Sequence, residues 1–565
     1  MNINSDILKD YENMRLVHYN DAHTLPNTVC YDELQDKPVT GVLKASHHVG
    51  NKLIQTYTTQ ENHVAVIAGT RLGKTTSYVI PTVLSFARQK VKKNMVIIDP
   101  KAEIYRTTQS MLEKEGYDIK VLNFRDPFHS EYWNPLTPIF RKYRSIKALS
   151  ETVRVCVNRK TGKQVKLFCG KEYESKKELE SAIKIQQELI MCDVSDAIDN
   201  FALMIIPNTG GKDDAIWVQG ARNLLKAFLY AMLEDSDKSN NPITEETFSI
   251  RTIFELVPLV SKIGDQGYFS SRHRDSKALR LAKNIILTTA DTTRSSFLAV
   301  FENCLSNYRN SISQTITTCN SFEIPDIINS GRPNVIFVIF RDELKSQYSL
   351  ITLFMQNMYT ELISAANMCE DGKLPIPWYF MADEFGNFAK MNDFECVISA
   401  CAGRNIFFII IIQSYAQLNN VYGENVARII LDNLNVHAFF GSNNPETLEM
   451  FSKECGKHTI ISPLSALNGD STSIDHYQID CVPLVTISRL SHLEIGECII
   501  TEANSGYVLL SKLERYYESP EFNSLPHSNI ENYKSKVNPF DARYIYRYIP
   551  DTSSSAAMRK MQNAC

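Results

Sequence analysis

The chain has 565 residues, of which 44% are hydrophobic and 22% are charged. These proportions are those of globular proteins, and the length suits about two to four domains, so a disordered or fibrous chain is excluded. The 60 Lys and Arg residues against 64 Asp and Glu residues leave a net charge of −4. A polycation that coats nucleic acid is therefore excluded, and any contact with DNA has to come from a local basic patch.

Neither hydropathy nor cysteine usage indicates a membrane-spanning or secreted chain. No run approaches the roughly 20 apolar residues that cross a bilayer, and the N-terminus lacks the apolar core of a signal peptide. The 13 cysteines are scattered without a Cys-x-x-Cys pair, and the closest two are Cys396 and Cys401. This pattern favours buried free thiols in a reducing cytoplasm over disulfides or a zinc site.

The first sixty residues are polar and show no sustained period, so we expect an extended lead-in or a small docking segment there. From residue 61, short apolar runs alternate with stretches of helical spacing. This alternation indicates a parallel sheet that is buried on both faces. The predicted strands are residues 63–68, 95–98, 119–124, 335–340, 378–382 and 406–412.

The strand–helix alternation stops between residues 138 and 330. A hairpin is expected over residues 153–168, turning at residues 160–163, and the remainder has helical spacing, as in residues 217–233. Because strands resume at residue 335, we predict an α/β fold with a mainly parallel sheet, interrupted by a mostly helical inserted domain. The predicted division is a lead-in over residues 1–60, an α/β domain over residues 61–137 and 331–515, the inserted domain over residues 138–330, and a polar tail over residues 516–565.

The strongest local signal is a strand that enters a loop ending in Gly-Lys-Thr and opening a helix. This is the arrangement of a P-loop, whose backbone N–H groups cradle phosphate oxygens. Lys74 would neutralise the β and γ phosphates, and the Thr75 hydroxyl would ligate Mg²⁺. Ala68 stands where the general pattern has its first glycine, and the alternative is a chance Gly-Lys-Thr in a loop. The predicted nucleotide-binding residues are Gly69, Thr70, Arg71, Leu72, Gly73, Lys74, Thr75 and Thr76.

A P-loop needs a carboxylate to hold the metal and another to activate water. Asp383 and Glu384 directly follow the predicted strand over residues 378–382, where such groups lie in open α/β sheets. We expect Asp383 to hold Mg²⁺ through water and Glu384 to polarise the attacking water. The alternative is a pair of helix-capping residues after a buried strand.

Three more residues stand next to predicted strands. Gln413 follows the strand over residues 406–412 and would sense the γ-phosphate or orient water, unless it only solvates the strand end. Arg404 precedes the same strand and is a candidate arginine finger toward a neighbouring subunit, or an ordinary surface arginine. Asp99, with Pro100 and Lys101, follows the strand over residues 95–98 and is expected to have a supporting role, either in ordering the P-loop or purely in the fold.

At these residues the chain resembles the VirD4/TraG-type coupling proteins of type IV secretion. The residues from Ala68 to Lys74, followed by Val79-Ile80-Pro81-Thr82, are similar to that family's P-loop and helix. Further boxes follow in the family's order: Asp99-Pro100-Lys101-Ala102-Glu103, with alanine in place of glycine; Trp133-Asn134-Pro135-Leu136; Asp383-Glu384-Phe385-Gly386-Asn387; Gln413-Ser414-Tyr415-Ala416-Gln417-Leu418 with Tyr422-Gly423; and Thr447 with Ser452-Lys453 and Gly456.

The resemblance implies a RecA-like ATPase that uses ATP and Mg²⁺ and assembles as a homo-hexamer around a channel. It implies single-stranded DNA, a relaxase or another secretion substrate, and the type IV channel components as partners. Two departures stand out. Thr75 replaces a glycine that is common in relatives, and the transmembrane helices that usually precede the P-loop domain are missing. We therefore expect a cytoplasmic protein that partners recruit to the inner face of the cell membrane, through residues 1–60 or the tail.

Basic residues gather after the P-loop helix and around the predicted hairpin, but acidic residues are interleaved with them, so either a DNA-binding patch or a solvated charged face fits. Two functions stay open. One is a motor whose ATP hydrolysis delivers substrate into the channel; the other is a nucleotide-gated receptor that hands a relaxase–DNA complex to a separate ATPase. A third reading, a chromosome-segregation or virion-packaging translocase of the same class, is disfavoured by the Asp-Pro-Lys and Asn-Pro-Leu boxes.

Overall fold

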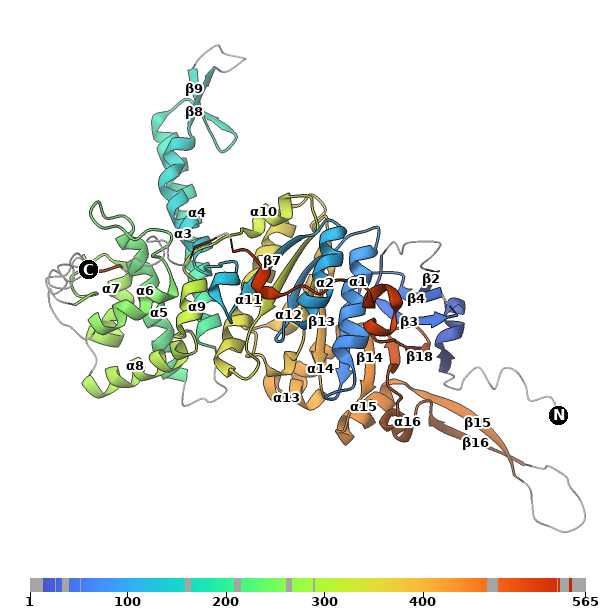
Figure 1. Cartoon of the computed structure of the whole chain (residues 1–565). Helices are drawn as coiled ribbons and strands as arrows, with labels where there is room; N and C mark the ends of the chain where they lie inside the picture. Colours follow the sequence, from blue (N-terminus) through green and yellow to red (C-terminus); the bar gives the residue numbers. More distant parts are fainter. Residues whose placement is uncertain are drawn as a thin grey trace, which may run out of the picture. The chain divides into compact units, whose positions relative to one another are not determined.

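The computed structural model describes residues 14–25, 27–32, 40–50, 52–157, 164–207, 215–260, 267–287, 290–464, 476–535, 537–538 and 548–550. The chain divides into two compact units, drawn in Figure 1. The α/β unit consists of residues 1–121, 324–342 and 358–533, and the helical unit consists of residues 122–323, 343–357 and 534–565. The greater part of the predicted insertion, residues 138–330, lies in the helical unit.

The α/β unit is built on a ten-stranded sheet. In order across the sheet its strands are β1 (Arg15–His18), β18 (Tyr507–Lys512), β17 (Glu497–Glu502), β14 (Val436–Gly441), β5 (Val64–Ala68), β13 (Ile406–Ile412), β12 (Trp378–Ala382), β6 (Asn94–Ile98), β11 (Asn334–Ile339) and β7 (Asp118–Asn123). From β14 to β11 neighbouring strands are parallel, whereas β17 is antiparallel to both β14 and β18. The six predicted strands coincide with six of these, and the predicted α/β class with a mainly parallel sheet is confirmed.

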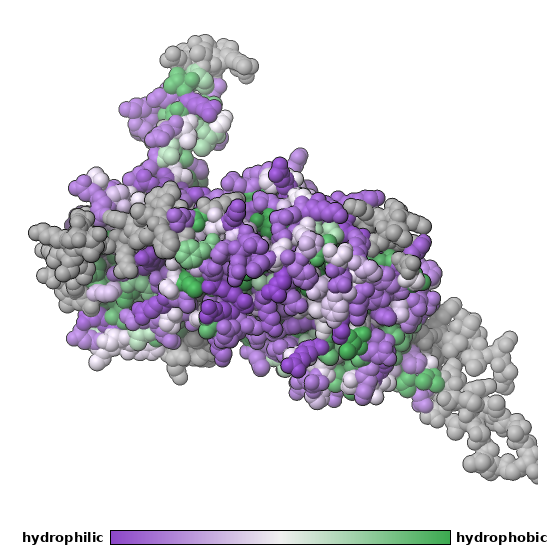
Figure 2. Space-filling model, in the orientation of Figure 1, coloured by the Kyte–Doolittle hydropathy of each residue, from purple (hydrophilic) through white to green (hydrophobic). Residues whose placement is uncertain are grey.

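The central strands are buried on both faces, which is why they read as continuous apolar runs. Every residue of β5, β12 and β13 is buried. The drawn surface of the α/β unit is in contrast mostly hydrophilic, with hydrophobic residues only in small groups (Figure 2). Among the described residues, no helix has both the length and the apolar character to cross a membrane.

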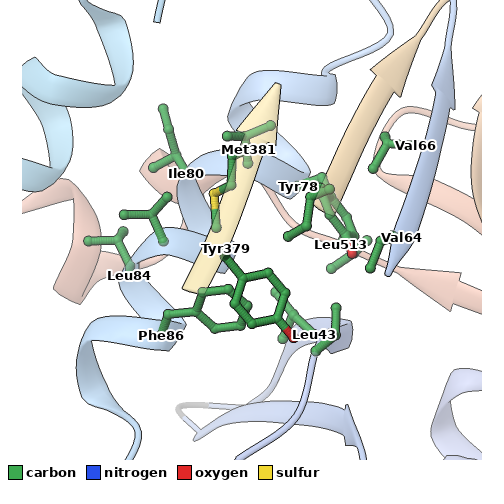
Figure 3. Packing of buried hydrophobic residues seen from close by; sticks show 14 of the residues in the cluster. Leu43, Val64, Val66, Tyr78, Ile80, Leu84, Phe86, Tyr379, Met381 and Leu513 are labelled. Atoms are coloured by element: carbon green, nitrogen blue, oxygen red, sulfur yellow. The ribbon is translucent and has the colours of Figure 1, made fainter. Parts of the chain in front are cut away.

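Helices pack against the sheet and supply the other half of its core. Ile80, Leu84 and Phe86 of α1 (Ile80–Arg88) belong to the same buried cluster as Tyr379 and Met381 of β12 (Figure 3). The α-helix α11 (Lys345–Met368) begins in the helical unit and ends in the α/β unit. The remaining α-helices of the α/β unit are α2 (Glu103–Lys114), α10 (Ile324–Asn329), α12 (Phe394–Cys401), α13 (Tyr415–Tyr422), α14 (Glu424–Asp432), α15 (Pro445–Glu454), α16 (Ile487–Ser491) and α17 (Pro520–Asn523).

The N-terminal segment, for which the sequence predicted an extended lead-in or a small docking segment, contains strands that were not among the predicted ones. Besides β1, a separate antiparallel sheet forms there in the order β2 (Thr28–Asp32), β4 (Lys52–Thr58), β3 (Leu43–Val49). Several of its buried positions carry polar side chains, among them Lys44, Gln55 and Thr56. Because no apolar run or alternation marks these strands, hydrophobic periodicity does not reveal them.

A buried lysine ties this small sheet to the main sheet. The Lys44 side chain is fully buried, and its Nζ donates to Glu502 Oε2 at 2.8 Å, Tyr507 OH at 2.6 Å and Thr28 Oγ1 at 2.9 Å. Burial lowers the pKa of Lys44 below its usual value, although Glu502 opposes the shift. The ion pair joins β3 to the end of β17 and fixes how the two sheets meet.

Two more features of the α/β unit were not predicted. The strands β15 (Lys457–Leu464) and β16 (His476–Pro483) form an antiparallel hairpin that projects from the unit in Figure 1. The start of the predicted polar tail is also packed: Phe522 is buried, and the Ser528 N–H donates to the Arg106 carbonyl at 2.9 Å. Hydrogen bonds between backbone groups form the hairpin and help to attach the tail. Such bonds leave little sign in a polar sequence.

The helical unit contains α3 (Thr137–Ala148), α4 (Lys176–Ile205), α5 (Ala215–Asp235), α6 (Ile250–Leu256), α7 (Lys277–Ala282), α8 (Asp291–Ser306) and α9 (Ser311–Ile316). The predicted helix over residues 217–233 lies inside α5. The predicted hairpin is formed by β8 (Arg154–Val157) and β9 (Gln164–Phe168), which β10 (Lys171–Tyr173) extends to three strands. Its predicted turn, residues 160–163, lies outside the described residues.

A buried carboxylate organises one end of α5. Asp235 is fully buried and accepts hydrogen bonds from Tyr268 OH at 2.8 Å, Arg272 Nη2 at 2.9 Å and Tyr548 OH at 3.0 Å. Tyr548 comes from the predicted tail, so this part of the tail belongs to the core of the helical unit. The 12 cysteines among the described residues are all free thiols, but only four of them are buried.

Replacing Lys44 with methionine tests the link between the two sheets. Lys44→Met leaves the Glu502 carboxylate without its cationic partner in a mostly buried place, so we expect the free energy of unfolding to fall by about 3 to 5 kcal/mol. Urea denaturation followed by circular dichroism measures the change, with exposed Lys373→Met as the matched control. A loss below about 1 kcal/mol, the size expected of a surface pair, would contradict this account.

Candidate nucleotide-binding site

The P-loop follows β5 and is fastened to the neighbouring strand. The Gly69 N–H donates to the carbonyl of Gly441, the last residue of β14, at 2.9 Å. An added Cβ at Gly69 would lie 3.2 Å from Leu72 Cδ1, so glycine lets the Leu72 side chain fold back over the loop. Gly73 has a left-handed backbone, with φ +85°, a conformation that glycine adopts without steric cost. These features fix the loop between Thr70 and Gly73.

The loop leads into a helical turn with unpaired donors. Residues Lys74–Val79 form a single π-helical segment that continues into α1. In the described part of the chain, no acceptor receives the backbone N–H groups of residues 73–76. Thr75 and Thr76 stand in this first turn, where the Thr76 hydroxyl donates to the Gly73 carbonyl at 3.3 Å. A glycine-bounded loop with free N–H groups at the start of a helix is a binding site for anionic oxygens.

The carboxylates predicted from a distant part of the sequence lie beside this loop. Lys74 Nζ is 2.9 Å from Asp383 Oδ1, and it also forms an ion pair with Glu384 Oε1. Asp383 is buried and follows the last residue of β12. The sheet therefore brings together residues that are 310 positions apart in the sequence.

Gln413 completes the group. It follows β13, which lies between β5 and β12 in the sheet, and its Nε2 donates to Glu384 Oε2 at 3.1 Å. Two strand spacings separate β5 from β12, or about 10 Å. The chain thus gathers a lysine, two carboxylates and an amide at the carboxyl ends of three adjacent parallel strands.

The electrostatics of the group follow from one cation facing two anions. Burial would lower the pKa of Lys74, but the Asp383 and Glu384 carboxylates outweigh it and raise the pKa above its ordinary value. Burial raises the pKa of Asp383, and the Lys74 ammonium only partly offsets this. Lys74 therefore carries its charge, and the group has a net negative charge that favours a divalent cation.

Arg404 lies outside this group. It precedes β13, at the opposite end from Gln413, and seven strand residues span about 23 Å. Its Nη1 donates to the Ala400 carbonyl at 2.9 Å and its Nε to Asn367 Oδ1 at 3.3 Å. The structure thus brings Lys74, Asp383, Glu384 and Gln413 together, but not Arg404 of the same chain.

Asp99 stands next to the group at the end of β6. It is buried, and its two carboxylate oxygens accept the N–H groups of Glu103 at 3.0 Å and Tyr105 at 2.8 Å, which caps the start of α2. Burial raises the pKa of Asp99 to about 7, although these two hydrogen bonds oppose the shift. Ala102 in the same turn has φ +56°, a conformation that glycine adopts more readily than alanine.

No role was predicted from the sequence for two residues beside this group, of which Gln417 contacts Gln413 and Gly386 contacts Gln417. The Gln417 Oε1 accepts the Gln413 N–H at 2.9 Å, and an added Cβ at Gly386 would lie 2.7 Å from Gln417 Cβ. Both residues stand within boxes of the family resemblance, which was the available signal.

A P-loop on a mainly parallel sheet, with a helical unit inserted between its strands, defines a RecA-like P-loop fold. The chain belongs to the family described as "Type IV secretory system Conjugative DNA transfer", whose profile matches residues 27–539. The predicted resemblance to coupling proteins is thereby confirmed.

Curated relatives are distant in sequence. The chain is 23% identical to the conjugal transfer protein TraG of Escherichia coli over 430 residues, which cover 73% of this chain and 58% of TraG. It is 21% identical to the protein VirD4 of Agrobacterium fabrum over 511 residues, which cover 89% of this chain and 66% of VirD4. The chain thus spans little more than half the length of the TraG relatives that it matches.

Solved structures with the same fold include the plasmid coupling protein TrwB in complex with a non-hydrolysable ATP analogue. The match has a TM-score of 0.55 at 14% identity and covers 89% of this chain and 93% of TrwB. The unbound form of the TrwB fragment matches with a TM-score of 0.53, covering 80% of this chain and 84% of the fragment. At this identity the likeness establishes the fold.

The raised pKa of Asp99 predicts a pH dependence of stability. Because the pKa of a carboxyl group in the unfolded chain is near 4, Asp99 stabilises the fold most below pH 4, and this contribution falls as the pH rises to about 7. Relative to Asp99→Asn, wild type should lose up to roughly 1.4 kcal/mol per pH unit between pH 4 and 7. Urea unfolding at several pH values measures this difference. Exposed Asp326→Asn is the control, and parallel curves for wild type and Asp99→Asn would contradict the prediction.

Proposed function

We propose that this chain is an ATP-hydrolysing coupling protein that receives a DNA or relaxase–DNA substrate and delivers it to a type IV secretion channel. The observation that carries the proposal is the contact of Lys74 with Asp383 and Glu384 at the carboxyl edge of the sheet. Membership of the conjugative DNA transfer family supports DNA as the transported substrate. The TrwB fold neighbours in complex with ADP and Mg²⁺ and with nucleotide analogues support the cofactors.

The residues present fit ATP and Mg²⁺. The N–H groups of residues 73–76 and the Lys74 ammonium would hold the phosphates, and an added Cβ at Gly73 would lie 3.1 Å from Ser77 Oγ, inside the turn. The Thr75 hydroxyl and the Asp383 carboxylate are hard oxygen donors of the kind that Mg²⁺ prefers. When bound, ATP would supply the phosphoanhydride bond that is hydrolysed, and Mg²⁺ would neutralise part of the negative charge of the phosphates.

Each side chain of the group has a distinct task in this proposal. Lys74 exchanges its carboxylate partners for phosphate oxygens, which frees Glu384 Oε1 to accept a proton from the attacking water. Gln413 holds Glu384 Oε2 through its amide and leaves the other oxygen directed toward the water. Asp383 keeps its negative charge beside the metal.

Partners and assembly are proposed on the family alone. We expect a homo-hexamer on single-stranded DNA, with the relaxase and the channel components as further partners that hold the protein at the inner face of the cell membrane. The described basic residues of the helical unit include the exposed Lys176, Lys177 and Lys184 of α4. Acidic residues share the helix, with Lys176 only 3.7 Å from Glu180, so no DNA-binding residue is singled out.

Glu384→Gln separates the motor from a nucleotide-gated receptor. We expect the variant to lose at least about 100-fold in kcat while nucleotide affinity survives, since it removes only the proton acceptor. Lys74→Ala should lose both phosphate affinity and turnover. Steady-state ATP hydrolysis with and without single-stranded DNA, and plasmid transfer in cells, are the measurements. Normal hydrolysis by Lys74→Ala would overturn the site, and continued transfer by Glu384→Gln would favour the receptor.

Arg404 is proposed to act on the site of a neighbouring subunit, because it lies far from the site of its own chain. Arg404→Ala should lower kcat about 1000-fold without weakening nucleotide binding. Mixing Arg404→Ala with Lys74→Ala subunits should restore activity, since an intact P-loop then meets an intact arginine across an interface. The control is a mixture of Lys74→Ala and Glu384→Gln subunits. Each variant is defective in the site of its own chain, so this mixture should stay inactive. No recovery in the first mixture contradicts action between subunits.

A further inference from the structure

The backbone of Glu384 is held in an unfavourable conformation. Its φ is +57°, in the left-handed region that costs a residue with a side chain roughly 1 to 2 kcal/mol. Such a conformation persists only where surrounding contacts fix it. The turn after Glu384 is held by α13, the helix that follows Gln413.

The helix α13 contacts this turn at two places. The ring of Tyr422, near its end, stacks on buried Phe385 with the ring centres 6.2 Å apart and the planes 7° from parallel. The Tyr422 OH also accepts the Met391 N–H at 3.4 Å. At its start, the Gln417 side chain covers Gly386 so closely that an added Cβ there would lie 2.7 Å from Gln417 Cβ and 2.8 Å from its Oε1. Glycine at 386 is therefore required for this contact.

Gln417 at the same time fixes the residue that holds Glu384. Its Oε1 accepts the backbone N–H of Gln413 at 2.9 Å, and the side chain of Gln413 donates to Glu384 Oε2 at 3.1 Å. One side chain thus sets the position of both partners, Gln413 through a hydrogen bond and Glu384 through the packing on Gly386.

We propose that Gln417 is the positioning residue of the hydrolytic group, which locks the turn after Glu384 to the start of α13 so that Gln413 and Glu384 stay in register. Gln417 contacts none of the reacting atoms and acts through Gln413 and Gly386. This inference rests on the proposed function, in which Glu384 accepts a proton from water. An orientation error of a proton acceptor lowers the rate of the chemical step and leaves ground-state binding intact.

Two substitutions at residue 417 separate positioning from packing. Gln417→Met keeps the length of the side chain but removes the acceptor, and Gln417→Glu keeps an acceptor oxygen. We expect Gln417→Met to lower kcat about 10- to 100-fold, the range for residues that orient a functional group, with the KM for ATP unchanged within about twofold. Gln417→Glu should keep turnover within about threefold of wild type. Gly386→Ala should reproduce the loss of kcat from the other side of the contact.

Hydrogen exchange gives a readout that does not depend on activity. In Gln417→Met, the amide of Gln413 and the turn over residues 384–388 should exchange faster, while the rest of the sheet keeps its protection. Exposed Asn420→Ala, on the same helix, is the matched control and should match wild type in both assays.

The outcomes distinguish this inference from the proposed function. Wild-type turnover in both Gln417→Met and Gly386→Ala, or unchanged exchange in residues 384–388, overturns the positioning role while hydrolysis stands. Equal losses in Gln417→Met and Gln417→Glu, with KM raised and the melting temperature lowered, also overturn it, because they indicate a packing role. If wild type itself hydrolyses no ATP, the proposed function fails, and the exchange experiment still decides whether Gln417 fixes the turn.

Discussion

The ion pairs of Lys74 with Asp383 and Glu384 are the interaction on which the site depends. The Lys74 ammonium faces two carboxylates in a mostly buried place, so the two anions share a single positive charge. Removing a partner from such a group is far more costly than removing a surface pair. In the proposed function, phosphate oxygens replace the carboxylates at Lys74, and the released carboxylates would face a divalent cation. The same ion pairs therefore hold the site together and give it the proposed preference for phosphate and a divalent cation.

The order of the strands makes this contact possible. If β5 and β12 were neighbours, their ends would lie about 5 Å apart, with no strand between them to carry Gln413. The intervening β13 opens the space to about 10 Å and places Gln413 in the middle. Because these three strands are parallel, their carboxyl ends meet at one edge, and the loops that follow them carry the residues of the candidate site. The long separation in sequence results from the helical unit, which is inserted between β7 and β11.

The sequence predicted the strands that are buried on both faces of the sheet, and it predicted which strand ends meet. The central strands appear as apolar runs, and the P-loop and the Asp383-Glu384 pair follow such runs directly. The N-terminal sheet could not be predicted in this way, because Lys44 occupies a core position and its partner Glu502 is 458 residues away. The contact of Gln417 with Gly386 was equally hidden, since the packing of a helix on a short turn leaves no periodic pattern. The distance of Arg404 from the site could be judged only from the direction of β13, because Arg404 precedes this strand and Gln413 follows it.

Backbone strain is concentrated around the same edge of the sheet. Left-handed φ values occur in eight described residues other than glycine, and four of them are Asn or Asp, which tolerate this conformation. Of the other four, Arg71, Ala102 and Glu384 lie in the loops after β5, β6 and β12, around the candidate site. At about 1 to 2 kcal/mol each, this conformation would be selected against if the loops only connected elements. Its persistence at three strand ends on the same edge of the sheet indicates that the position of these loops, and not their stability, is what the fold preserves.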